Sequence, residues 1–239
     1  MRTAMRALAA LSLVLAPLLT HADDYWLQAD SYHPAAGAHL VVHLDAGQAF
    51  AAREEKAYER AHTERFELRL PNDVRDLLAS TNDGAKPLID DALPAPGPFL
   101  VTLVTGSEQV GRERSWHFLK LLGHTGDDTE TDLNHRYTGM QYEIVLLQNP
   151  LTMHAGEEQI VQLLFETKPL PNATAYALRR GADGAVTELS GLSDERGVVR
   201  FPLTQPGVWL IRSVHTRPCK GCKDADTESF SAAYTFSLE

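Results

Sequence analysis

Short apolar-rich runs separated by turn residues dominate this chain and predict an all-β protein. Residues 66–70 alternate strictly between apolar and polar side chains and stop at Pro71, a pattern typical of a strand with one buried face. Residues 99–104 are continuously apolar, which favours a strand buried on both sides. Further strands are expected at residues 25–29, 38–44, 142–147, 158–167, 173–179, 186–189, 198–201, 208–214 and 233–238.

Two segments favour short helices. Residues 54–62 contain several helix formers and predict a short helix, and residues 73–79 predict another with Asn72 as its N-cap. Residues 116–122 fit either a helix or a strand. Residues 80–84 and 123–134 are polar and are expected to be loops, while the proline-rich residues 90–98 predict a stiff connection.

The first 22 residues have the layout of a secretory signal peptide. Arg2 and Arg6 precede an apolar run over residues 7–19, and the small residues Thr20 and Ala22 stand at the third and first positions before a cleavage position. The run is shorter than the roughly 20 residues that a membrane-spanning helix needs. We therefore expect a periplasmic protein whose mature chain begins near Asp23 and contains no transmembrane segment.

The mature chain is expected to fold in two parts. From Tyr142 on come seven short strands with turn residues between them, which predicts an immunoglobulin-like β-sandwich that we place at residues 150–239. Residues 23–149 form a β-rich amino-terminal portion. The strand that begins at Tyr142 fits either part, so the sequence leaves the boundary open.

The charge of the chain is strongly acidic. Its 22 basic and 32 acidic residues give a formal net charge of −10, and removal of the signal takes away two arginines and no acid. A nucleic acid is a poor partner for such a surface, because phosphates bind to clustered Lys and Arg. A cation or a basic partner fits better, although solubility alone also accounts for the charge.

Turn and strand motifs give the chain a family resemblance. They comprise Asp-Asp-Tyr-Trp-Leu-Gln at 23–28, Pro34, Gly37, Tyr-Glu-Ile-Val at 142–145, Gln-Asn-Pro at 148–150, Ala-Gly at 155–156, Lys-Pro-Leu-Pro-Asn-Ala at 168–173, Ser-Asp-Glu-Arg-Gly at 193–197, Phe201, Pro-Gly-Val-Trp-Leu-Ile at 206–211 and His215. In these motifs the chain resembles a periplasmic family labelled as the periplasmic component of cobalt-type ABC transport systems, and it is similar to NikM-type nickel-uptake proteins. The resemblance implies nickel or cobalt as cargo and a membrane uptake transporter as partner.

The densest group of metal-ligating side chains lies near the carboxyl terminus. His215, Cys219 and Cys222 are followed by Asp224 and Asp226, and imidazole and thiolate are good ligands for zinc, nickel or copper. The Cys-Lys-Gly-Cys spacing also suits a disulfide, because thiols this close usually pair in an oxidising compartment. A redox-active pair is a third reading. The sequence leaves the three open.

Histidines elsewhere offer weaker metal sites. His33 and His39 flank a turn and are candidates to approach one another, whereas His39 and His43 share a strand face about 13 Å apart. His124 and His135 bracket a polar loop with four acids that offers ligands to a cation but lacks the EF-hand spacing.

Catalytic motifs are absent from the sequence: no nucleophile elbow, His-Glu-x-x-His or phosphate-binding glycine loop occurs. We therefore do not expect an enzyme. The sequence favours a periplasmic metal-handling accessory that binds a divalent transition metal, nickel or cobalt with zinc or copper as alternatives. A metal-free β-sandwich binding or scaffold module is the second hypothesis.

Overall fold

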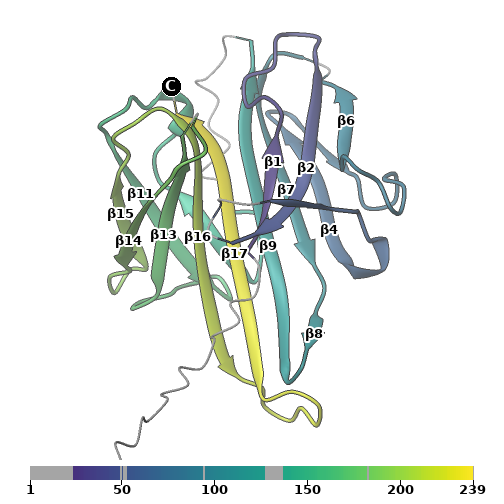
Figure 1. Ribbon diagram of the computed structural model, residues 1–239, viewed down its shortest axis with the longest axis vertical. Helices are drawn as coiled ribbons and strands as arrows, with labels where there is room; N and C mark the ends of the chain where they lie inside the picture. Colours follow the sequence, from purple (N-terminus) through teal and green to yellow (C-terminus); the bar gives the residue numbers. More distant parts are fainter. Residues whose placement is uncertain are drawn as a thin grey trace, which may run out of the picture.

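The computed structural model describes residues 24–48, 50, 53–93, 95–126, 137–181 and 183–238. The predicted signal peptide therefore lies outside the described residues, as does most of the acidic loop between His124 and Tyr137. Strands dominate the described chain, as the sequence predicts, and Figure 1 shows them stacked in layers. The only helical elements in the described part are two 3₁₀ turns, η1 (Arg60–His62) and η2 (Pro150–Thr152).

A nine-stranded sheet, here called the central sheet, runs through the whole molecule. Its strand order is β14 (Val186–Leu192), β13 (Thr174–Arg180), β16 (Gly207–Pro218), β17 (Thr227–Leu238), β9 (Glu113–Thr125), β7 (Gly97–Thr105), β4 (Thr63–Leu70) and β5 (Asp73–Asp76), with β8 (Glu108–Val110) paired to β9. Strands β17 and β9 are parallel, and every other pair in this sheet is antiparallel.

Two smaller sheets pack against the central sheet. The amino-terminal sheet contains β1 (Asp24–Ala29), β2 (His39–Gly47), β3 (Glu54–Lys56) and β6 (Ile89–Ala92). The carboxy-terminal sheet contains β10 (Tyr142–Leu146), β11 (Glu158–Phe165), β12 (Lys168–Pro169) and β15 (Val198–Pro202). In Figure 1 they lie on opposite sides of the long strands β9, β16 and β17.

The two outer sheets enclose separate hydrophobic cores. Alternate side chains of one central strand enter different cores: Trp209 and Ile211 of β16 face the carboxy-terminal sheet, and Leu210 packs with the amino-terminal core. The side chains of strand β7 also alternate between the two cores, and the strand is buried along almost its whole length. A strand with apolar neighbours on both faces needs apolar residues at every position, which explains the continuous run at 99–104.

The predicted immunoglobulin-like sandwich is formed by the carboxy-terminal sheet and strands β13, β14, β16 and β17. The boundary predicted at residue 150 does not coincide with a break between sheets or cores. Strand β10 precedes it yet pairs with β11, and β17 pairs with β9. The amino-terminal and carboxy-terminal segments thus share one sheet.

Three local predictions were wrong. Residues 54–62 form strand β3 and end in the single turn η1 instead of a helix, and residues 73–79 supply the edge strand β5. The expected stiff connection at 90–98 includes most of strand β6 and the start of β7. In each case pairing with a neighbouring strand overrides a local helix or turn preference. Residues 116–122, which were ambiguous, lie in strand β9.

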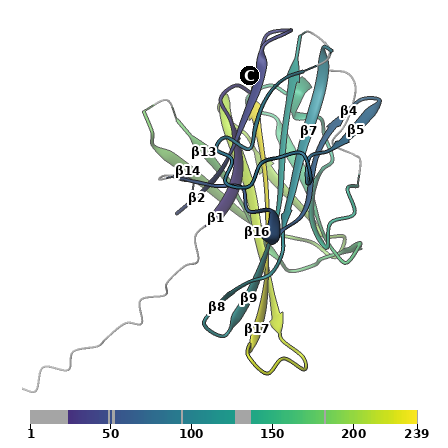
Figure 2. The same ribbon diagram turned by 90° about the vertical axis from the view of Figure 1, so that its right-hand side faces the viewer.

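Two hairpins project together from one end of the molecule. The ends of β8 and β9 and the connection between β16 and β17 extend beyond the outer sheets, and we call this projection the arm (Figures 1 and 2). The register of β16 and β17 continues unbroken to the pair Pro218–Thr227 at its tip.

Candidate functional site

The cysteines of the predicted metal site are joined to one another. Cys219 and Cys222 form a disulfide in the turn at the tip of the arm, and the described chain contains no free cysteine. Disulfide sulfurs are not thiolates, so neither atom is a metal ligand in this form. The sequence leaves open a metal site, a disulfide and a redox-active pair at these cysteines, and the structure contains the disulfide.

The acids beside this disulfide hold the two hairpins of the arm together. Arg114 of β9 donates from its Nη2 to both carboxylate oxygens of Asp224, at 2.7 and 2.9 Å. Arg112 donates from Nε and Nη2 to the two carboxylate oxygens of Asp226, at 2.5 and 2.6 Å. The hydrogen bond from Arg114 lowers the pKa of Asp224 below its usual value. Asp224 therefore serves as an ion-pair partner in this arrangement.

His215 lies apart from these acids, among aromatic rings. Its ring centroid is 4.5 Å from that of Phe165 and 6.3 Å from that of Tyr142. Burial lowers the pKa of His215, and the nearby Arg217 adds to the effect. The predicted group of His215, Cys219, Cys222 and Asp224 is thus engaged in other contacts, and no group of three metal-ligating side chains occurs among the described residues.

The histidines of β2 are bound to carboxylates. His39 is exposed, and its Nδ1 lies 2.7 Å from Asp90 on β6. His43 lies between Glu55 and Asp30, at 2.7 and 3.1 Å from its two ring nitrogens. The pairing of β2 with β6 places His39 beside Asp90.

His33 instead packs against His124. Their ring centroids are 4.2 Å apart with 50° between the ring planes, and both side chains are half-buried. His33 lies in the segment after strand β1, and His124 lies near the end of β9. We call them the histidine pair.

Gly123 is what allows this approach. The backbone N–H of His124 donates to the carbonyl oxygen of Tyr32 at 2.9 Å. A Cβ atom at Gly123 would collide with that carbonyl oxygen and with the ring of Phe99. The absence of a side chain therefore lets the segment after β1 lie directly on the end of β9.

The second contact of His124 determines which of its ring nitrogens is the hydrogen-bond donor. Its Nδ1 lies 2.9 Å from the carbonyl oxygen of Gly126. A carbonyl can only accept, so Nδ1 is the donor, and in the neutral imidazole Nε2 is the nitrogen that carries the lone pair. Metal-ligating histidines in proteins are typically oriented by a hydrogen bond of this kind.

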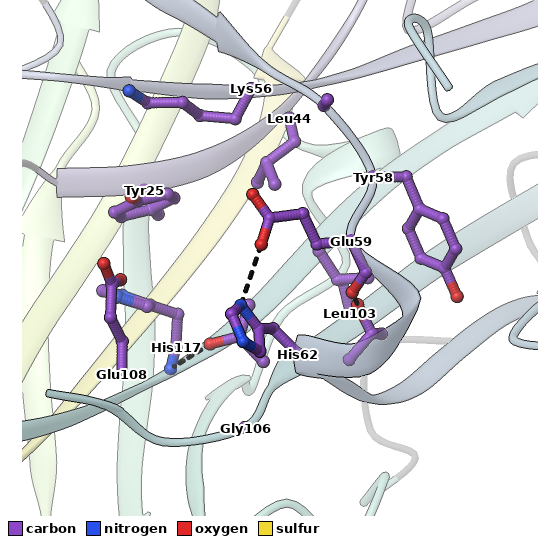
Figure 3. A pocket seen from close by; sticks show the side chains of 13 residues that line it. Tyr25, Leu44, Lys56, Tyr58, Glu59, His62, Leu103, Gly106, Glu108 and His117 are labelled. Atoms are coloured by element: carbon purple, nitrogen blue, oxygen red, sulfur yellow. Dashed lines mark hydrogen bonds and ion pairs between the residues drawn. The ribbon is translucent and has the colours of Figure 1, made fainter. Parts of the chain in front are cut away.

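A pocket of about 180 Å³ opens between the amino-terminal sheet and the central sheet. Its lining residues come from β1, β2, the segment around η1, the end of β7, β8 and β9, and Figure 3 shows their side chains around the cavity. Its lining includes Tyr25, Lys56, Glu59, His62, Glu108 and His117. The ring of Tyr25 lies on that of His117, with centroids 4.3 Å apart.

Sequence reasoning missed both His117 and the partnership of His124 with His33. His117 occupies an ordinary position on a long strand, where nothing in the local pattern marks a pocket. For His124 the adjacent Gly123 was a usable signal, since a glycine inside a strand indicates a close approach of another backbone.

Comparisons with known proteins give a family and one loosely similar structure. No curated protein matches the chain. Among solved structures, the D0-D1 domain of intimin is 12% identical, with 89% of this chain and 97% of that chain covered and a TM-score of 0.23. Within the described residues no helix is long and apolar enough to cross a bilayer. A family model described as a domain of unknown function, DUF4198, matches residues 20–217, and the chain therefore belongs to the DUF4198 family.

Proposed function

We propose that this chain is an exported, non-enzymatic accessory protein that binds a divalent transition metal ion, nickel or cobalt, and delivers it to a membrane uptake transporter. The observation that carries the proposal is the histidine pair, in which the lone pair on Nε2 of His124 is available beside the ring of His33. The net charge of −10 and the resemblance to cobalt-type and NikM-type uptake proteins support it.

The separation of the two rings suits ligands at adjacent positions on one ion. With metal–nitrogen bonds of about 2 Å, two imidazoles at right angles have ring centroids about 4 to 5 Å apart. The observed 4.2 Å falls in that range. Square-planar or octahedral ions offer such right-angled positions, and Ni²⁺ readily adopts the first.

Metal titration tests this proposal. Mature protein is titrated with NiCl₂ and CoCl₂ by calorimetry, and we expect a dissociation constant of about 1 µM or tighter, equivalent to about 8 kcal/mol. His33→Ala and His124→Ala should each weaken binding at least about tenfold. His39→Ala is the matched control and should bind like wild type, because His39 lies on another strand beside Asp90. If all three variants bind metal as tightly as wild type, the histidine pair is not the metal site.

A second candidate is a binding module that takes no metal. The pocket beside His117 favours it, because a concave site with a few convergent polar groups is the usual form of a small-molecule site. NMR separates the two candidate functions. Chemical-shift changes confined to Tyr25 and His117 when a set of small molecules is added support the metal-free binding module. Changes confined to His33 and His124 when a metal ion is added support the metal-binding accessory protein.

A further inference from the structure

The disulfide at the tip of the arm contributes little to the stability of the fold. Cys219 and Cys222 close a loop of four residues. In the chain-entropy model the stabilisation by a cross-link grows with the logarithm of the length of the loop that it closes, so a loop this short gains least. Stability alone therefore accounts poorly for the presence of this bond.

The arm is held in place by contacts that do not involve the sulfur atoms. The ladder between β16 and β17 continues to the pair Pro218–Thr227, directly beside Cys219. The Cys219 N–H donates to the carbonyl oxygen of Asp226 at 2.8 Å, and the Asp226 N–H donates to that of Arg112 at 2.7 Å. Opening the disulfide should therefore leave the arm folded, which reversible chemistry at this bond requires.

The position of the disulfide gives a reactant access to it. Cys219 and Cys222 are each only half-buried, and residues 220, 221 and 223 are exposed. A Cβ atom placed on Gly221 would meet nothing within 4 Å, so no neighbouring segment covers that side of the turn. Figures 1 and 2 show the turn at the far end of the arm, away from the outer sheets. A disulfide exchanges only when a thiolate can reach one of its sulfurs, and this turn satisfies that condition.

The charges around the disulfide favour the release of thiolates. Lys220 and Lys223 stand beside the two cysteines, and neither forms an ion pair within the part of the chain that the structure describes. The acids that follow them are already paired, because Asp224, Asp226 and Glu228 each bind an arginine. Unmatched positive charge beside a sulfur stabilises the thiolate that leaves when the bond breaks.

We propose that the Cys219–Cys222 disulfide is a thiol–disulfide exchange site that takes two electrons from a thiol reductant, with Lys220 and Lys223 stabilising the released thiolates. A reductant thiolate attacks one cysteine sulfur and forms a mixed disulfide, while the bond between the cysteines breaks and the other cysteine leaves as a thiolate. A second reductant thiolate attacks the reductant sulfur of the mixed disulfide, which forms the oxidised reductant and releases the remaining cysteine. The two protons lost by the reductant thiols end on the two cysteines.

This site is independent of the proposed metal site. The arm begins at the Glu113 end of strand β9, whereas His124 lies at the other end of that strand. Failure of either proposal therefore leaves the other standing.

Redox equilibration tests the exchange site. Mature protein is incubated without oxygen in about 10 mM glutathione and about 0.1 mM glutathione disulfide, and free thiols are counted by alkylation and mass spectrometry. We expect at least about half of the molecules to carry two free thiols, because structural disulfides of secreted proteins resist this buffer whereas labile ones do not. Circular dichroism should be the same for both forms. Protein that stays mostly oxidised, or that unfolds on reduction, would overturn the proposal.

Lysine variants test the contribution of charge. The rate constant for reduction is measured with 2-mercaptoethanol, a reductant that carries no charge apart from its thiolate. Lys220→Gln and Lys223→Gln, at exposed positions where folding is not threatened, should each lower this rate constant at least about twofold. Lys168→Gln removes an exposed lysine from β12 and is the matched control. Equal rate constants in all three variants would overturn the role assigned to the lysines.

Two further reductants identify the source of the electrons. Glutathione represents a low-molecular-weight thiol, and reduced thioredoxin represents a protein dithiol. A rate constant for thioredoxin at least about 1,000-fold above that for glutathione assigns a protein dithiol as the reductant, and a smaller ratio assigns a low-molecular-weight thiol. Either result supports the exchange site, whereas reaction with neither reductant overturns it.

Discussion

Lys120 of β9 and Glu143 of β10 form an ion pair in the interior of the protein. The ammonium lies 2.6 Å from the carboxylate, and both side chains are at most 3% exposed. Lys120 also donates to the carbonyl oxygen of Ile144 at 3.0 Å. Glu143 accepts from the Thr138 N–H and hydroxyl at 2.7 and 2.9 Å and from the Gly139 N–H at 3.1 Å. The pair joins the central sheet to the carboxy-terminal sheet.

Removing one member of this pair should be costly. Lys120→Met leaves the Glu143 carboxylate buried without its counter-charge, and we expect a loss of about 3–5 kcal/mol in the free energy of unfolding. Adding Glu143→Gln should recover part of that loss, because the buried charge is then gone. Urea denaturation measures both.

An exposed pair is the control for this measurement. Arg200 and Glu158 lie 3.0 Å apart with about half of each side chain exposed. Arg200→Met should change the free energy of unfolding by about 1 kcal/mol or less. A similar small effect of Lys120→Met would mean that water reaches the interior pair.

The stability contribution of His43 should depend on pH. Burial opposes its charge, but hydrogen bonds to Glu55 and Asp30 outweigh this and raise the pKa of His43 above 6.5. A raised pKa stabilises the fold below the unfolded-state pKa, and the contribution is lost as the pH rises through the folded-state pKa. In wild-type protein this contribution to the free energy of unfolding should therefore fall as the pH rises above 6.5, and His43→Gln should reduce that fall.

NMR titration of His43 provides the direct check on this prediction. Its imidazole should titrate above 6.5, whereas His117 should titrate near 4. A titration of His43 below 6.5 would show that burial dominates over the two carboxylates.

Gly123→Ala should separate the histidine pair. The added methyl group collides with the Tyr32 carbonyl and the Phe99 ring, and overpacking of this kind typically costs about 1–3 kcal/mol. We expect weaker nickel binding together with this destabilisation. Gly106→Ala is the matched control, because its Cβ would meet nothing closer than 3.4 Å. Unchanged nickel affinity in folded Gly123→Ala protein would contradict the proposed site.

Replacing both cysteines should leave metal binding intact. The disulfide closes a four-residue loop, for which the chain-entropy model gives at most about 2 kcal/mol. The ion pairs of Arg112 and Arg114 also hold the arm. Cys219→Ser/Cys222→Ser protein should thus unfold within about 2 kcal/mol of wild type and bind nickel equally well. Loss of nickel binding in this variant would show that the cysteines contribute to the metal site.

Strand positions were largely predictable because each strand carries its own signal. The strict alternation at 66–70 matches β4, where Phe66, Leu68 and Leu70 are buried, and Trp209 is a core residue as its position on an alternating strand predicts. The Gly197 turn also has the positive φ expected of it, at 72°. Edge strand β5 was missed because its exposed residues do not alternate in polarity.

The histidine pair was not predictable from spacing. His33 and His124 are 91 positions apart in the sequence, and they meet because β1 and β9 belong to sheets that pack face to face. The same holds for Lys120 and Glu143, which pair across two layers. Local patterns determine which residues form strands, while contacts between layers depend on the register of the whole assembly.

A sheet used by two cores makes the fold indivisible. If the polypeptide were cut between β10 and β11, each fragment would keep strands whose backbone amides and apolar side chains had lost their neighbours. Such fragments are expected to aggregate when expressed alone, whereas co-expressed fragments have the means to reassemble along β9 and β17. Intact protein should accordingly melt in a single step, without a stage in which one half survives the other.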